Sequence, residues 1–223
     1  LSIKNFYPNT YYLTKILFQS APISAALFMI SIGNFIILIY ASRFGEFAIA
    51  GYGSAARFEQ ILLLPVLGLN TAIISIVGQN FGAKEYLRVK QSYYLSIIYG
   101  TVIMIISGLI IFLSADKIVS IFSNNIVVIN YGTTYLKISA LIFPAYPIYF
   151  ISNGFFMALK KASYAMNLNI VRNVLLPVPT ILFANFIGGS FKNFFWSYCL
   201  FNWFFAILLL IFVIFYIKNK LHS

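Results

Sequence analysis

Long apolar stretches, separated by short groups of charged residues, run through nearly the whole chain. A helix needs about 20 apolar residues to cross the hydrocarbon core of a bilayer. Six stretches of 19 to 27 residues contain no charged side chain, namely 16–42, 60–83, 91–115, 138–159, 173–191 and 193–217. The pattern predicts an all-α polytopic membrane protein with six transmembrane helices, at about 15–41, 47–80, 90–114, 134–158, 163–188 and 193–217.

The second predicted helix, 47–80, is longer than a bilayer requires. Its 34 residues would extend about 50 Å at ~1.5 Å per residue, so the helix must tilt, bend or project from the membrane. Pro65 and Gly68 supply a kink site within it. Pro177 and Pro179 are expected to kink the fifth helix in the same way, because proline removes a backbone hydrogen bond.

The segments outside the six helices are short. Residues 1–14 are polar and aromatic and are expected to be a cytoplasmic linker, while 218–223 are expected to be a cytoplasmic tail. The connection at 115–133 is mildly amphipathic and is predicted to form a short interfacial helix on the outer side. The six-helix transmembrane bundle covers residues 15–217 and contains no internal repeat. The first residue is Leu1 rather than Met, which we interpret as a sign of a longer protein.

Composition supports the membrane interpretation and explains the charge. The chain is 61% hydrophobic and 9% charged, whereas soluble domains are about half apolar and a quarter charged. A net charge of +11 would suggest nucleic acid in a soluble protein, but here the basic residues are expected to mark cytoplasmic loops. One side of the membrane then carries nine basic residues, Lys4, Lys15, Lys84, Arg88, Lys90, Lys160, Lys161, Lys218 and Lys220. The other side carries four, Arg43, Lys117, Lys137 and Lys192. This predicts a multi-pass protein of the cell (inner) membrane with both termini in the cytoplasm.

The chain lacks the residue groups that most enzymes and metalloproteins need. Cys199 is the single cysteine and lies in an apolar run, and His222 is the single histidine. No acid pair and no metal-ligand cluster can be assembled. The glycines near Gly78 and Gly82 do not form a phosphate loop, because no Gly-Lys-Ser/Thr follows. We therefore expect no enzyme activity, no cofactor, no metal and no nucleic-acid partner.

Glu59 is the one acidic residue well inside a predicted helix, since Glu46 and Asp116 lie at helix ends and Glu85 lies in a loop. An ionised carboxylate is costly in the bilayer interior unless a cation is close, and such residues commonly mark ion or substrate pathways. Glu59, with Gln60 beside it, is therefore our candidate for coupling to protons or sodium ions. The alternative is a hydrogen-bonded or ion-paired acid that only fixes helix packing.

Two arginines also fall inside predicted helices. Arg57 is two residues from Glu59, so it points to roughly the opposite side of the helix and is not its local partner. It either snorkels toward a helix end or contacts a ligand. Arg172 lies near the middle of the membrane, ahead of Pro177 and Pro179. It either satisfies the backbone carbonyls that these prolines leave free or faces a cavity.

Amide and aromatic side chains provide further candidates. Asn34, Asn70 and Asn153 are expected to contact a substrate, although intramembrane amides also join helices, at about 0.6 kcal/mol each. Aromatic residues make up 19% of the chain. They would either line a cavity for apolar cations or face lipid and the membrane interfaces.

Several motifs resemble one family. They are Gly51-Tyr52-Gly53, Arg57-Phe-Glu59-Gln60, Leu64-Pro65, Gly68-Leu-Asn70 and GQNFGAKEYLRVKQ at 78–91. Together they are similar to the second helix of a lobe of the multidrug and toxic compound extrusion (MATE) transporters. The Arg-x-Glu-Gln and Gly-Gln-Asn elements resemble the carboxy-terminal lobe in the DNA-damage-inducible, DinF-like branch. Residues 153–179 resemble the hairpin between the fourth and fifth helices of that lobe.

The resemblance covers about residues 15–217 and implies one six-helix lobe of a twelve-helix transporter. It implies a cation-coupled (H⁺ or Na⁺) antiporter that exports small amphipathic or cationic organic compounds. Its partners would be the lipid bilayer and either an amino-terminal lobe or a second copy of the chain. The sequence departs from the family at Met157, where many members have Gln, and at Lys160, where many have Gly. Two alternatives stay open, a lipid-linked saccharide flippase of the same superfamily and a non-transporting orphan lobe or truncated product.

Overall fold

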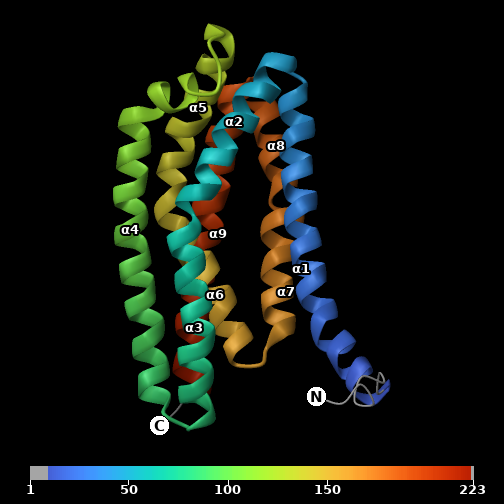
Figure 1. Ribbon diagram of the computed structural model, residues 1–223, viewed down its shortest axis with the longest axis vertical. Coiled ribbons are helices and arrows are strands. Elements are labelled where there is room, and N and C mark those ends of the chain that lie inside the picture. Colours follow the sequence, from blue (N-terminus) through green and yellow to red (C-terminus); the bar gives the residue numbers. More distant parts are fainter. Residues whose placement is uncertain (1–9, 222–223) are drawn as a thin grey trace, which may run out of the picture.

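The computed structural model describes residues 10–221, and every regular element in that range is a helix. The elements are α1 (Thr10–Ser42), α2 (Glu46–Leu62), α3 (Leu64–Gly82), α4 (Tyr86–Ser120), α5 (Ile126–Ile142), α6 (Tyr146–Ala158), α7 (Ala162–Ile170), α8 (Pro177–Phe186) and α9 (Phe191–Lys220). A 3₁₀ turn, Phe143–Ala145, joins α5 to α6, and a π-helical turn, Val171–Leu175, joins α7 to α8. Since α2 also continues into α3 after one residue, the chain forms six long helical rods (Figure 1). The predicted all-α bundle is confirmed.

The composition of these rods is that of a multi-pass membrane protein. Five segments are long and apolar enough to cross a membrane, Leu64–Gly82, Tyr86–Ser120, Ile126–Ala158, Ala162–Phe186 and Phe191–Lys220. The first rod contributes a shorter apolar stretch, Phe28–Ser42. Large apolar side chains such as Leu113 on α4 and Phe215 on α9 are exposed on the outside of the bundle. Such faces suit contact with lipid, because backbone polar groups are already paired within the helices.

The helix boundaries differ from the sequence-based expectation between residues 115 and 133. α4 continues to Ser120 and α5 begins at Ile126, so the predicted interfacial helix is wrong. The sequence places Asp116 at a helix end, but α4 has 35 residues and extends about 52 Å, well beyond the ~30 Å core. Its charged last turns therefore lie outside the core without ending the helix. There Asp116 pairs with Lys137 of α5 at 3.3 Å.

The two ends of the chain are also more helical than expected. α1 begins at Thr10, so residues 10–14 of the expected linker are helical, and residues 1–9 lie outside the described part. α9 runs to Lys220 and takes up half of the expected tail, while His222 lies outside the described residues. In Figure 1 the start of α1, the end of α9 and the α3–α4 and α6–α7 connections lie at the same end of the bundle.

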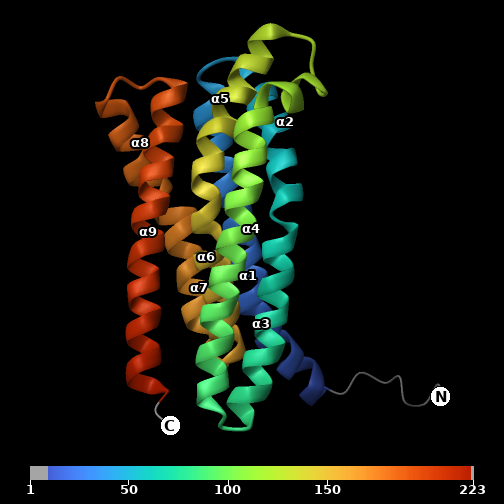
Figure 2. The ribbon, with the colours of Figure 1, turned by 90° about the vertical axis from the view of Figure 1, so that its left-hand side faces the viewer.

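The α5–α6 rod lies at the centre of the packing. α2 packs on α5, α3 packs on α6, and α4 packs on both, while α1 packs on α7 and α8 packs on α9 (Figures 1 and 2). Gly51 allows the close approach of α2 to α5, because a Cβ at this position would lie 2.7 Å from the Val128 carbonyl oxygen. The central rod therefore holds α2 and its polar side chains close to those of α5 and α6.

Two helices end at lysines with an uncommon backbone conformation. Lys84 follows α3 with φ 62° and Lys160 follows α6 with φ 59°. Glycine usually occupies this left-handed position at a helix end, because side chains strain the backbone there. Both lysines lie at the end of the bundle that carries the α3–α4 and α6–α7 connections (Figure 1). Lys160, where many members of the resembled family have glycine, therefore occupies a turn whose backbone conformation favours glycine.

Candidate substrate cavity and coupling site

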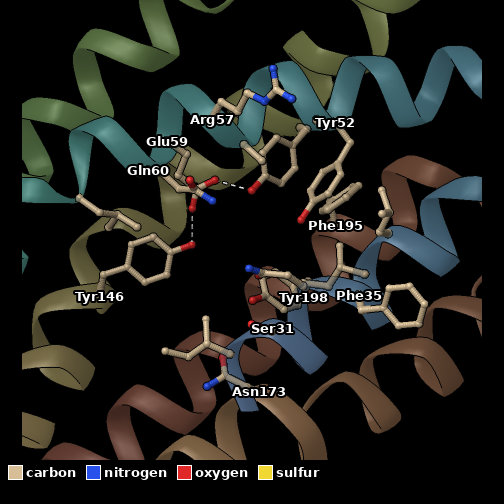
Figure 3. A pocket seen from close by; sticks show the side chains of 18 of the residues that line it. Ser31, Phe35, Tyr52, Arg57, Glu59, Gln60, Tyr146, Asn173, Phe195 and Tyr198 are labelled. Atoms are coloured by element: carbon tan, nitrogen blue, oxygen red, sulfur yellow. Dashed lines mark hydrogen bonds between the residues drawn. The ribbon is translucent and has the colours of Figure 1, made fainter. Parts of the chain in front are cut away.

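A cavity of about 530 Å³ lies inside the bundle. Its walls come from α1, α2, the α5–α6 rod, the π-helical turn and α9. The polar side chains that line it are Ser31, Asn34, Tyr52, Arg57, Glu59, Gln60, Tyr135, Tyr146, Arg172, Asn173 and Tyr198 (Figure 3). Aromatic rings, Phe35, Phe150 and Phe195, line it as well. The cavity therefore combines charged groups with apolar surface.

The Glu59 carboxylate is bound by three hydroxyl groups. Glu59 is buried, at 6% exposure. Tyr135 and Ser139 donate to Oε2, the latter at 2.7 Å. Tyr146 donates to Oε1 at 2.6 Å (Figure 3). An ionised carboxylate only accepts hydrogen bonds, so three donors satisfy it well. Among the described residues Glu59 forms no ion pair, and its hydrogen bonds come from hydroxyl groups and not from Gln60.

The local sequence explains why the three donors meet. Tyr135 and Ser139 are four residues apart on α5 and therefore lie on one face of that helix. Tyr146 follows the 3₁₀ turn and begins α6, so it reaches the carboxylate from a different direction (Figure 3). Glu59 on α2 is thereby tied to both halves of the central rod.

Arg172 lies on the π-helical turn between α7 and α8. In this turn the Leu176 N–H donates to the Val171 carbonyl at 2.8 Å, five residues back. Pro177 has no N–H and cannot bond the Asn173 carbonyl, as the next residue of an α-helix would. Helices commonly widen into such a turn at functional sites. The prolines therefore fix the place where the fifth rod departs from regular geometry.

The Arg172 guanidinium faces aromatic rings of α6. Its central carbon lies 4.1 Å from the ring centre of Tyr149, 5.0 Å from that of Tyr146 and 5.4 Å from that of Phe150. These are cation–π distances. The prediction offered two roles for Arg172, and the structure places the side chain at the cavity wall. Tyr146 thus contacts Arg172 with its ring and Glu59 with its hydroxyl.

α1 approaches the π-helical turn closely. A Cβ at Gly33 would lie 2.7 Å from the Asn173 carbonyl oxygen, which is the oxygen that Pro177 leaves without its usual partner. The next residue, Asn34, lines the cavity. Packing of α1 on this turn therefore sets the distance between two cavity walls.

The structure brings together four of the predicted site residues, and Glu59, Gln60, Asn34 and Arg172 all line the cavity. Arg57 lines it too, and its guanidinium extends away from the Glu59 carboxylate (Figure 3).

Asn70 and Asn153 do not line this cavity. Asn70 packs on Gly154 of α6, and Asn153 donates to the Ala165 carbonyl at 3.2 Å. These two amides lie where helices join, which was the alternative role given to intramembrane asparagines.

The predicted kink residues lie at different kinds of position. α2 and α3 are separated at Leu63, and Pro65 is the second residue of α3. Gly68 lies inside α3, where a Cβ would meet no atom within 4 Å. Pro177 and Pro179 are the first and third residues of α8, directly after the π-helical turn.

Sequence reasoning missed Tyr135, Ser139 and Tyr146 as partners of Glu59. The fourth helix was expected to begin at 134, which puts Tyr135 at the start of a helix, whereas α5 begins at Ile126 and Tyr135 lies well inside it. The available signal was the spacing of four between two hydroxyl residues in an apolar helix. Asn173, which lines the cavity beside Arg172, was not among the candidate site residues either.

A buried carboxylate and two arginines around a cavity, in a bundle of membrane-spanning helices, define a protein of the membrane-transporter class. The MatE family matches residues 22–183, and the chain belongs to this family of multidrug and toxic compound extrusion transporters. The family consists of transporters and not enzymes.

Known proteins resemble the chain over part of their own length. The chain is 24% identical over 158 residues to an FAD transporter of Shewanella oneidensis, which covers 71% of the chain and 35% of that protein. It is 22% identical over 189 residues to the multidrug export protein MepA of Staphylococcus saprophyticus, covering 85% of the chain and 42% of that protein. Its fold matches that of a MOP superfamily transporter from Pyrococcus furiosus, with a TM-score of 0.89, 20% identity and coverage of 100% of the chain and 50% of that structure. The chain therefore spans half or less of the length of these proteins.

Proposed function

We propose that the complete protein is a cation-coupled antiporter that exports small amphipathic or cationic compounds, and that this chain is its carboxy-terminal lobe. The family membership and the half-length match support a transporter built from two lobes. The Arg57-Phe-Glu59-Gln60 motif supports the carboxy-terminal lobe and the DinF-like branch. The mixture of charged groups and aromatic rings in the cavity suits an amphipathic substrate.

The observation that carries this proposal is the buried Glu59 carboxylate with its three hydroxyl donors. When a proton binds Glu59, the carboxyl gains an O–H that needs an acceptor, so at least one hydroxyl must stop donating. A sodium ion would likewise compete for the same oxygens. In either case the contacts between α2 and the α5–α6 rod change.

α2 is able to respond to such a change. The helix is interrupted at Leu63, four residues after Glu59, and Pro65 starts the next segment. Helix interruptions at proline act as hinges. Ion binding at Glu59 would therefore bias two arrangements of α2, which is the two-state element that a coupled carrier requires.

The partner of this lobe is an amino-terminal lobe or a second copy of the chain. Polar cavity residues such as Asn34 and Gln60 are exposed in the single lobe and would be costly against lipid. We place the lobe in the cell membrane with both ends of the chain in the cytoplasm, because one end of the bundle carries more basic residues. Residues 1–223 expressed alone should not confer drug resistance, and robust resistance from a chain shown to be monomeric would contradict the two-lobe proposal.

The test of coupling is Glu59→Gln in the complete protein, reconstituted in liposomes with an imposed proton or sodium gradient. This substitution keeps the shape of the side chain and removes its change of charge. We expect loss of ion-driven efflux with substrate binding partly retained. Glu46→Gln is the matched control, because Glu46 lies on the same helix but outside the cavity. Efflux by Glu59→Gln at the wild-type rate, with unchanged pH and sodium dependence, would mean that Glu59 only fixes helix packing.

A further inference from the structure

The charged groups of the cavity do not balance. Arg57, Arg172 and Glu59 line it, so the lining carries two positive groups and one negative group. All four acidic side chains of the sequence are described, and among them only Asp116, near the end of α4, forms an ion pair, with Lys137 of α5. Neither cavity arginine is therefore neutralised by an acidic side chain of this lobe. An unpaired positive charge inside a membrane attracts an anion strongly.

Glu59 is poorly placed to recognise a cationic substrate. Its oxygens already accept hydrogen bonds from Tyr135, Ser139 and Tyr146. A carboxylate has about four acceptor positions, and three are already used, so an organic cation would compete with hydroxyl groups from two helices. No other acidic side chain of the described residues lines the cavity.

Arg172 is well placed to recognise an anion. Its guanidinium carbon lies over three aromatic rings of α6, which restrict its position. The five N–H donors of a guanidinium lie in its plane, so stacking of this kind is compatible with paired hydrogen bonds to an oxyanion. Asn173, beside it on the π-helical turn, also lines the cavity and adds an amide.

We propose that this lobe binds the anionic end of an aromatic amphipath, a carboxylate, sulfonate or phosphate group, at Arg172. Arg57 adds a second positive charge from α2, and Phe35, Phe195 and Tyr198 contact the apolar body (Figure 3). This rests on the proposed export function, and among its candidate substrates it selects anionic amphipaths over cationic ones.

The test compares two probes with the same aromatic body and opposite charge, naphthalene-2-sulfonate and its trimethylammonium analogue. Binding is measured by calorimetry to the complete protein in phosphatidylcholine nanodiscs. We expect the sulfonate to bind at least tenfold more tightly than the ammonium. Arg172→Gln should weaken sulfonate binding at least tenfold and leave ammonium binding unchanged or stronger, because it removes one positive charge.

Arg43→Gln is the matched control. Arg43 also lies over a tyrosine ring, that of Tyr40 at 5.2 Å, but it does not line the cavity. It should leave both affinities unchanged. If Arg172→Gln does not fold, Arg57→Gln replaces it, since Arg57 is exposed. A threefold loss of sulfonate affinity in that variant supports the proposal, and no loss overturns it.

Anionic lipid headgroups present the same chemistry as a free substrate. Adding phosphatidylglycerol to the nanodiscs separates the two sources, because a bound headgroup would compete with the sulfonate and lower its apparent affinity. Either result leaves an anion site at Arg172. Tighter binding of the ammonium, or sulfonate binding insensitive to Arg172→Gln in a folded protein, overturns the inference. Arg172-dependent binding without transport in liposomes would instead refute only the export function.

Discussion

Tyr146→Phe tests the link between the buried carboxylate and ion-driven transport. The substitution removes the hydroxyl that donates to Glu59 Oε1 at 2.6 Å. It keeps the ring that lies 5.0 Å from the Arg172 guanidinium carbon. The change therefore affects one wall of the site and leaves the aromatic contact in place.

The expected size follows from the loss of one hydrogen bond to a charged, buried group. Such a bond contributes about 1.5–3 kcal/mol, and a tenfold change in an equilibrium corresponds to about 1.4 kcal/mol. Because this bond ties α2 to α6, its loss should shift the equilibrium between the two proposed arrangements of α2 about 10- to 100-fold. The pH dependence and the sodium dependence of efflux should then both differ from those of the wild type.

The assay is efflux from proteoliposomes containing the complete protein over a range of pH, with a matched sodium series. Tyr149→Phe is the control, because it removes a hydroxyl from the same helix that donates to Asn169 at 2.5 Å instead of to Glu59. It should lower stability without moving the pH or sodium midpoint. If Tyr146→Phe is folded and its midpoints equal those of the wild type, Glu59 is not the coupling group.

Three further outcomes are expected from the packing and the turns. Gly51→Ala should destabilise the protein by about 1–3 kcal/mol, because the added Cβ meets backbone atoms of α5. Gly68→Ala should stabilise it by about 0.5–1 kcal/mol, because the added Cβ at this helical position meets no atom within 4 Å. Thermal melting in detergent measures both changes, and equal shifts in the melting temperature would contradict the packing of α2 on α5. Lys160→Gly should raise the melting temperature by the equivalent of about 1 kcal/mol through relief of the left-handed strain; a lower melting temperature would mean that the lysine side chain stabilises the turn. Single cysteines placed at 83–85 and at 121–125 should react with impermeant thiol reagents from the cytoplasmic and outer sides respectively, in a Cys199→Ala background, and the reverse pattern would invert the topology.

The sequence pattern was sufficient to predict the helical rods of the bundle and to identify Glu59 as the acidic residue in its interior. Charge-free intervals reflect the thickness of the bilayer, so they locate helices well. They locate helix ends poorly, because a helix continues after it leaves the hydrocarbon core. Asp116 illustrates this, since its charge lies within α4 and not after it. The fourth helix was expected to start at 134 for the same reason, whereas α5 starts at Ile126.

The partners of Glu59 could not be predicted because they depend on the rotation of one helix against another. Tyr135 and Ser139 reach the carboxylate only because Gly51 lets α2 lie close to α5. The orientation of the Arg172 side chain could likewise not be predicted from the sequence. The prolines predicted a local departure from helical geometry, but whether it would be a kink or a π-helical turn depends on packing against α1 at Gly33.

The π-helical turn at Val171–Leu175 is equivalent to one extra residue inserted into a continuous helix. One residue of an α-helix corresponds to a rotation of about 100° around its axis. Deleting one residue from this turn would restore regular geometry and rotate α8 by that angle relative to α7. Pro177, Thr180 and Ala184, which form the buried face of α8, would then turn away from their present neighbours. A single-residue deletion here would thus rotate the buried face of half a rod by more than a quarter turn, whereas substitutions at the same positions would leave that face where it is.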